Sequence, residues 1–241
     1  MKIIEKLSVK QADNGAISPA TYVCFGDSIT QGGFECYVNH KGKIETVIDE
    51  SSCYGAKLKR VLQILYPKGQ INYINAGICG DKAVNALMRL EESVLQYHPD
   101  LVIVSFGAND SSKGMDGLEE FKQALDTIFR KIKATGADVI FLTSIKVNTY
   151  IDARLTEQEL VEVAKRQIAL TENGTKKAFW EAGKEIAKNN GVLICDCEKK
   201  WQKLSKNGVD TTALLANHIN HPSREMHWMY VNEILNILFE N

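Results

Sequence analysis

Four short polar segments of this 241-residue chain offer groups suited to chemistry at a carbonyl carbon. Ser28 would stand at a strand-to-helix turn, where its hydroxyl can attack and its backbone N–H can bind an oxyanion. A glycine in the second segment permits close backbone approach, the Asn109 amide could donate to the same oxygen, and the last segment offers an imidazole. Taken alone, Asp27-Ser28 fits a helix N-cap better. The segments are Gly26-Asp27-Ser28-Ile29, Ile78-Cys79-Gly80-Asp81, Gly107-Ala108-Asn109-Asp110 and Asn217-His218-Ile219-Asn220-His221-Pro222.

Five apolar runs alternate with stretches of helical spacing. The runs lack a strict polar–apolar alternation, which predicts strands buried on both faces. Strands that alternate with helices predict a three-layer α/β/α sandwich with a five-stranded parallel sheet, of the flavodoxin-like type. Ligands of such sheets bind beyond the carboxyl ends of the strands, where the first three polar segments stand. The runs are 22–25, 71–74, 101–106, 138–142 and 191–194, and the helical stretches are 56–65, 83–95, 118–132, 156–189 and 223–239.

The chain contains no internal repeat, low-complexity tract or proline-rich linker, so we expect residues 1–241 to form a single domain. Residues 34–50 interrupt the alternation of strands and helices, with Lys41-Gly42-Lys43 between two strand-like runs. They predict a small hairpin-like insertion after the first strand. The insertion is either a cover over the site or a surface excursion without a role.

Composition excludes several kinds of partner. Lys and Arg number 29 against 30 for Asp and Glu, which gives no electrostatic reason to expect nucleic acid or an anionic membrane. No apolar run approaches the roughly 18 residues of a transmembrane helix. The N-terminus lacks the apolar run of a signal peptide, so we expect a cytoplasmic protein. The six cysteines form no CxxC pair, so we expect structural or free thiols, no metal site and no cofactor.

Together and in this order, the four segments resemble the sequence blocks of the SGNH hydrolases, the GDSL family of esterases and lipases, from about residue 21 to 239. The resemblance implies that Ser28 is the nucleophile and that His221 is the general base. It also implies an oxyanion hole formed by the backbone N–H groups of Ser28 and Gly80 and the side-chain amide of Asn109. Asp27 and Asp110 resemble residues that support the site loops.

One position departs from the family pattern, in which an aspartate stands three residues before the histidine. His218 occupies that place, with Asn217 and Asn220 beside it, and none of these can act as a carboxylate. Three arrangements remain open for the imidazole. A carboxylate from Asp210 or Asp196 could orient it, a carbonyl oxygen could do so, or the serine and histidine could act as a bare pair.

The resemblance implies a serine hydrolase that cleaves a carboxylic ester through an acyl-enzyme. We expect a short-acyl (acetyl) esterase that acts on a carbohydrate or another small molecule. The alternatives are an acyl thioesterase or lysophospholipase of the same fold and, from another class, a non-catalytic binding module with a degenerate triad. The sequence does not predict an oligomeric state.

Overall fold

The computed structural model describes residues 1–240 and is built around a five-stranded sheet in which every neighbouring pair of strands is parallel. The strands lie in the order β4-β1-β5-β6-β7, and β1, which lies between β4 and β5, is buried along its whole length. The sequence analysis predicted this sheet, and the structure confirms it. The strands are β1 (Ala20–Gly26), β4 (Ile71–Gly77), β5 (Leu101–Ser105), β6 (Asp138–Leu142) and β7 (Leu193–Cys195).

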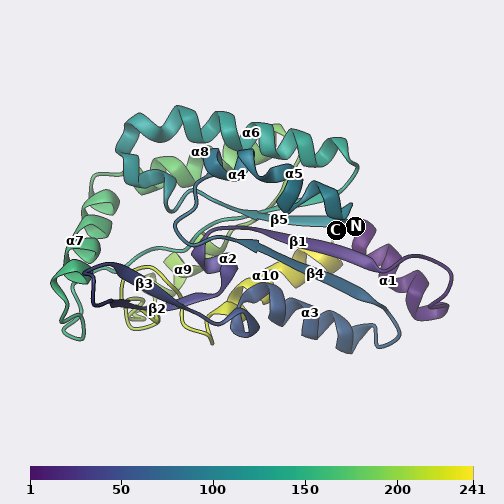
Figure 1. Ribbon diagram of the computed structural model, residues 1–241, viewed down its shortest axis with the longest axis horizontal. Helices are drawn as coiled ribbons and strands as arrows, with labels where there is room; N and C mark the ends of the chain where they lie inside the picture. The colour runs from purple at the N-terminus through teal and green to yellow at the C-terminus, as the bar shows by residue number, and fades with distance from the viewer. Residues whose placement is uncertain (241) are drawn as a thin grey trace.

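Helices cover both faces of the sheet and complete the predicted three-layer sandwich (Figure 1). Side chains such as Leu58, Trp201 and Ile234 form one buried layer, and Leu90, Phe129 and Phe179 are part of the other. One face carries α1 (Lys2–Ala12), α3 (Tyr54–Leu65), α9 (Cys197–Lys206) and α10 (His227–Glu240); the other carries α4 (Ala83–Met88), α5 (Leu90–Ser93), α6 (Leu118–Ala134) and α8 (Thr175–Asn189).

The helical stretches differ from the prediction in three ways. The stretch 156–189 is two helices, α7 (Gln158–Glu172) and α8, because Gly174 adopts a left-handed φ of 82° between them. The stretch 83–95 is also broken, at Arg89 and again at Val94. Helices α1 and α9 were not predicted at all. The remaining helices are short: α2 (Ser28–Gln31), η1 (Glu50–Ser52), η2 (Leu95–Tyr97) and η3 (Asp110–Gly117).

The segment after α2 forms a two-stranded antiparallel sheet, separate from the main one. Its strands are β2 (Gly33–Val38) and β3 (Ile44–Ile48). The backbone N–H of Asp49 donates to the Gly32 carbonyl at 2.8 Å, which ties the end of this hairpin to its start. Figure 1 shows the hairpin beside α7, at the end of the molecule opposite α1.

The register of the main sheet brings its loops together. Gly26 at the end of β1 pairs with Gly77 at the end of β4 and with Ser105 at the end of β5. The three loops that follow therefore meet at one edge of the sheet, as parallel strands require. No helix within residues 1–240 is both long and apolar enough to cross a bilayer.

Candidate active site

Ser28 and His221 meet although 193 residues separate them in the chain. The Ser28 hydroxyl oxygen lies 2.9 Å from Nε2 of His221, and both side chains are buried. Ser28 begins α2 directly after β1, and the Asp27 carboxylate caps this helix by accepting from the Ile29 N–H at 3.0 Å. The structure thus brings together the two residues that the resemblance implied as nucleophile and base.

The other imidazole nitrogen faces a main-chain carbonyl. Nδ1 of His221 lies 3.0 Å from the carbonyl oxygen of Phe34 in strand β2, and the Cys36 sulfur follows at 3.9 Å. Because a carbonyl oxygen only accepts hydrogen bonds, Nδ1 must carry the proton of the neutral ring. Nε2 then presents its lone pair to the Ser28 hydroxyl. The sequence left three arrangements open for the imidazole, and the structure has the one in which a carbonyl oxygen orients it.

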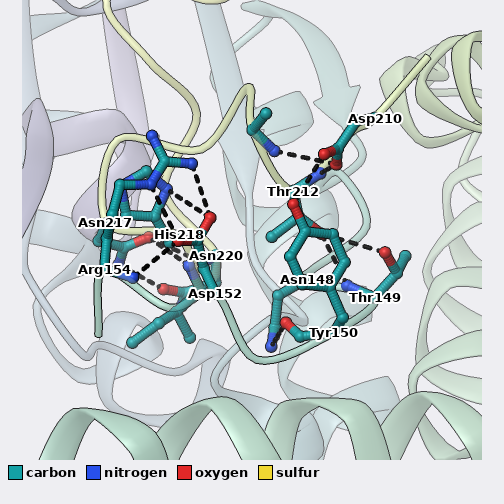
Figure 2. Close-up of polar contacts among 12 residues, drawn as sticks. Asn148, Thr149, Tyr150, Asp152, Arg154, Asp210, Thr212, Asn217, His218 and Asn220 are labelled. Atoms are coloured by element: carbon teal, nitrogen blue, oxygen red, sulfur yellow. Dashed lines mark hydrogen bonds and ion pairs between the residues drawn. The ribbon is translucent and has the colours of Figure 1, made fainter. Parts of the chain in front are cut away.

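Neither of the carboxylates proposed from the sequence reaches His221. Asp210 instead accepts from the Tyr150 hydroxyl at 2.7 Å (Figure 2), and Asp196 caps α9 by accepting from the Lys199 N–H at 3.1 Å. Within residues 1–240, no carboxylate makes a hydrogen bond or ion pair with His221. The suggestion of Asp210 or Asp196 as the orienting acid is wrong, because both are held by local partners of their own.

His218 and Asn220 also turn away from the imidazole. His218 adopts a left-handed φ of 55°, and its Nδ1 faces Oδ2 of Asp152 at 3.7 Å (Figure 2). Asn220 accepts from the side-chain amide of Asn217 at 2.9 Å. The Asn217 side-chain oxygen accepts three backbone N–H groups, including that of His221 at 2.9 Å. Asn217 therefore shapes the loop that presents His221.

Burial sets the proton affinity of the imidazole. It lowers the pKa of His221 to about 4, while the Phe34 carbonyl and the charge of Glu35 act in the opposite direction. The ring is therefore neutral at pH 7, which is the form that can take a proton from a hydroxyl.

The three oxyanion donors implied by the resemblance lie on the loops after β1, β4 and β5, whose ends are in register. Gly80 has a φ of 77°, a conformation that favours glycine, and a Cβ there would point into open space. Within residues 1–240, the backbone N–H groups of Ser28 and Gly80 donate to no other group. The Asn109 amide is already engaged, with the Asp81 carbonyl at 3.1 Å and with Asp27 at 3.4 Å.

Two buried carboxyl groups support these loops. Burial, aided by the nearby charges of Asp110 and Asp81, raises the pKa of Asp27 to about 7 against the opposing bond from the Ile29 N–H. Burial also raises the pKa of Asp110 to about 6, although its carboxylate accepts from the N–H groups of Ala83 and Gly107, each at 2.9 Å. Asp110 thereby joins the loop after β5 to the start of α4.

A family model described as the GDSL-like Lipase/Acylhydrolase family matches residues 24–229. The chain belongs to this family. The match contains all four sequence blocks, so the resemblance seen in the sequence is confirmed.

Curated relatives of this GDSL-like protein are esterases. An arylesterase of Vibrio mimicus is 35% identical over 72 residues, which are 30% of this chain and 36% of the relative. An acetylxylan esterase of Geobacillus stearothermophilus is 29% identical over 148 residues, which are 55% of this chain and 67% of the relative. The chain thus spans only about a third of the length of the arylesterase.

Two solved structures share the fold. A catalytic mutant of the acetylxylan esterase from Geobacillus stearothermophilus aligns with a TM-score of 0.65 and 21% identity, over 92% of this chain and 96% of that one. A two-domain esterase active on acetylated mannans aligns with a TM-score of 0.67 and 18% identity, over 99% of this chain and 53% of that one. At these identities the likeness establishes the three-layer fold.

The sequence analysis missed two residues around this GDSL-like site. Arg89 binds Asp81 through Nε at 2.9 Å and Nη2 at 2.6 Å, and its Nη1 donates to the Ala76 carbonyl at 2.9 Å. It thereby braces the loop that contains Gly80. The Phe34 carbonyl was also missed. Arg89 lies within the predicted helical stretch 83–95, where a charged residue gives no sign of a specific partner. A main-chain carbonyl has no signature in a sequence.

Proposed function

We propose that this protein is a serine hydrolase that cleaves a short-acyl ester, preferably an acetyl ester of a carbohydrate or another small molecule. The observation that carries the proposal is the 2.9 Å contact between the Ser28 hydroxyl and an imidazole nitrogen whose lone pair faces it. An uncharged hydroxyl is a poor nucleophile at neutral pH, so a base within hydrogen-bond reach is what the chemistry requires.

The reaction has two halves. The Ser28 oxygen attacks the ester carbonyl while Nε2 of His221 takes the hydroxyl proton, and this proton then passes to the departing alkoxide as the acyl-enzyme forms. Water attacks the acyl-enzyme next, giving one proton to His221, and collapse of the second tetrahedral intermediate returns the proton to Ser28 and releases the acid. Both tetrahedral intermediates carry an oxyanion, which the N–H groups of Ser28 and Gly80 would bind.

Asn109 would supply the third donor. In the resting structure its amide nitrogen contacts Asp27 at 3.4 Å, the longer of its two hydrogen bonds. The longer bond is the weaker one, so an oxyanion beside Ser28 would take over this hydrogen. The bond to the Asp81 carbonyl would meanwhile keep the amide in place.

The Phe34 carbonyl would perform part of the work of the missing aspartate. It fixes the tautomer and the orientation of His221, but it has no net charge to stabilise the imidazolium that forms during attack. The low pKa of His221 agrees with this, because a buried imidazolium without a carboxylate is costly. We expect an active enzyme whose imidazole is a weaker base than that of a complete triad.

The substrate class rests on the relatives. An acetylxylan esterase and an esterase active on acetylated mannans are similar to this chain, and both names specify acetylated polysaccharides. An acyl thioesterase, a lysophospholipase and a non-catalytic binding module would each give a different outcome in the test below. The cytoplasmic location expected from the N-terminus stays a prediction.

The test is a series of p-nitrophenyl esters from acetate to long chains, together with an acetylated xylo-oligosaccharide. Hydrolysis should be fastest for acetate, and Ser28→Ala should lower kcat more than about 10³-fold. The exposed Ser205 provides the matched control, since Ser205→Ala should leave the rate unchanged. Turnover that persists in Ser28→Ala would exclude Ser28 as the nucleophile, and a preference for long chains would favour a lipase-like enzyme. An absence of turnover and of labelling by a fluorophosphonate probe would favour the binding module.

A further inference from the structure

The strand that supplies the Phe34 carbonyl has an irregular register at this point. Gly33 pairs with Ile48 and Cys36 pairs with Thr46, so two residues of β2 stand opposite the single residue Val47 of β3. This is a β-bulge, a feature that redirects groups of one strand out of the ladder. The two residues of the bulge are Phe34, whose carbonyl faces His221, and Glu35.

Arg224 holds both ends of the hairpin. Its guanidinium binds the Glu35 carboxylate in a bidentate manner, through Nη1 at 2.5 Å and Nη2 at 3.1 Å. Its Nε donates to Oδ2 of Asp49 at 3.0 Å, just beyond β3. The guanidinium carbon also lies 4.3 Å from the centre of the Phe34 ring. One side chain therefore contacts both bulge residues and the return of the hairpin.

Arg224 is close to His221 in the chain, which links the hairpin to the imidazole. Arg224 follows His221 by only three residues, so it belongs to the same segment as the imidazole. The hairpin is separate from the five-stranded sheet, so the ladder of that sheet does not fix the Phe34 carbonyl in place. Bidentate arginine–carboxylate pairs fix geometry as well as contributing energy. Together these contacts join the acceptor carbonyl to the segment that carries its donor.

We propose that Arg224 is a positioning residue that keeps the Phe34 carbonyl aligned with Nδ1 of His221, and so keeps the imidazole directed at Ser28. This inference rests on the proposed hydrolase function. A displacement of a catalytic group by about 1 Å can cost on the order of 10²-fold in rate. Loss of the clamp should therefore reduce the chemical step and leave the binding of a small ester nearly unchanged.

The first experiment compares Arg224→Ala and Arg224→Lys with the wild type on p-nitrophenyl acetate. In Arg224→Ala, kcat should fall roughly 10–100-fold while KM stays within about twofold. Lysine restores one charged contact but not the bidentate pair, so Arg224→Lys should recover part of the loss. The matched control is Lys6→Ala, because Lys6 forms a part-buried ion pair with Asp100 at 3.0 Å before β5, at the far end of the sheet. If Arg224→Ala lowers kcat no more than Lys6→Ala does, the proposal is wrong.

The second experiment observes the imidazole directly and needs no turnover. In ¹⁵N-histidine-labelled wild type, His221 should show a protonated Nδ1 and a bare Nε2, and its signals are assigned by their loss in His221→Gln. In folded Arg224→Ala, the same ring should shift toward a mixture of tautomers. An unchanged pattern would overturn the positioning role. If no ester is hydrolysed by wild type, the proposed hydrolase fails, whereas this measurement still decides whether Arg224 orients the ring.

Discussion

The two sides of the proposed active site are built on different parts of the fold. The proposed oxyanion side consists of Gly80, Asn109, Asp27 and Asp81, on loops that leave three adjacent strands of the main sheet, and of Arg89, which binds Asp81 from between α4 and α5. The histidine side, formed by Phe34, Cys36, Asn217, His221 and Arg224, joins a separate hairpin to the segment before α10.

The supporting charges differ as well. Buried carboxyl groups and Arg89, which donates two hydrogen bonds to one oxygen of Asp81, hold the proposed oxyanion side. On the histidine side, the group that orients the imidazole is an uncharged carbonyl, and the ionic contacts lie one step further out, at Arg224. The proposed oxyanion donors are therefore held by loops of the main sheet, whereas the orientation of the proposed base depends on how the hairpin is held.

Among the variants that separate the two sides, the largest loss of rate should come from weakening the proposed oxyanion side. Asn109→Ala removes one oxyanion donor and should lower kcat roughly 10²–10³-fold with little change in KM for a small ester. The exposed Asn207 gives a control, since Asn207→Ala should keep the wild-type rate. A loss below about threefold would mean that the Asn109 amide stays with Asp27 throughout the reaction, and the oxyanion hole would then consist of backbone donors alone.

A smaller effect should come from adding a charge to the histidine side. The Cys36 sulfur lies 3.9 Å from Nδ1 of His221 and accepts from the Asn217 amide at 3.4 Å, so Cys36→Asp would place a carboxylate near the ring. An opposite charge favours the imidazolium, and the pKa of His221 should rise by roughly 1–2 units. The acid limb of kcat/KM should rise with it, and Cys36→Asn, which has the same shape without the charge, should not show this shift. If both variants show the same acid limb, a carboxylate at position 36 does not raise the pKa of His221, and the prediction is wrong.

The last prediction concerns stability and not the reaction rate. The pKa of Asp27 is about 7 in the folded protein and near 3.8 in an unfolded chain, so the folded state binds more protons between these values. Stability must therefore fall as the pH rises from about 4 to 7. Asp27→Asn should reduce this fall, by an amount on the order of 2–4 kcal/mol at pH 8. Urea unfolding at pH 5 and pH 8 measures the difference, with the exposed Asp116→Asn as control. Equal pH dependence in wild type and Asp27→Asn would contradict the buried carboxyl.

The sequence predicted the sheet and the pairing of Ser28 with His221, for physical reasons. Most strands contain an apolar run, although β4 includes Asn72 and Asn75. Gly80, Asn109 and His221 could be singled out by residue type and by their positions after strands or before the last helix. Helix α1 was not predicted because its apolar pattern is weak: only two of its apolar side chains, Ile3 and Leu7, are buried. Helix α9 was not predicted because most of its residues are polar.

The support of the imidazole could not be predicted. A main-chain carbonyl such as that of Phe34 exists at every residue, so only the fold selects one. Arg224 and Glu35 are 189 residues apart, and each is an ordinary charged residue until the bulge in β2 brings them together. The sequence shows that no aspartate stands three residues before His221. It does not show that the Phe34 carbonyl contacts the imidazole in its place, because this contact joins distant segments of the chain.

The pH dependence of kcat/KM tests the central claim most directly, which is that His221 acts as a buried base without a carboxylate partner. It should be measured on p-nitrophenyl acetate in wild type and in the double variant Asp27→Asn/Asp110→Asn, since this variant removes both buried carboxyls, which titrate near pH 7 and pH 6. In the variant, kcat/KM should rise with pH through a single acid limb close to pH 4, the pKa of His221. An acid limb between about pH 6 and 7 in the same variant would mean a base of ordinary or raised affinity for protons, and would contradict the account.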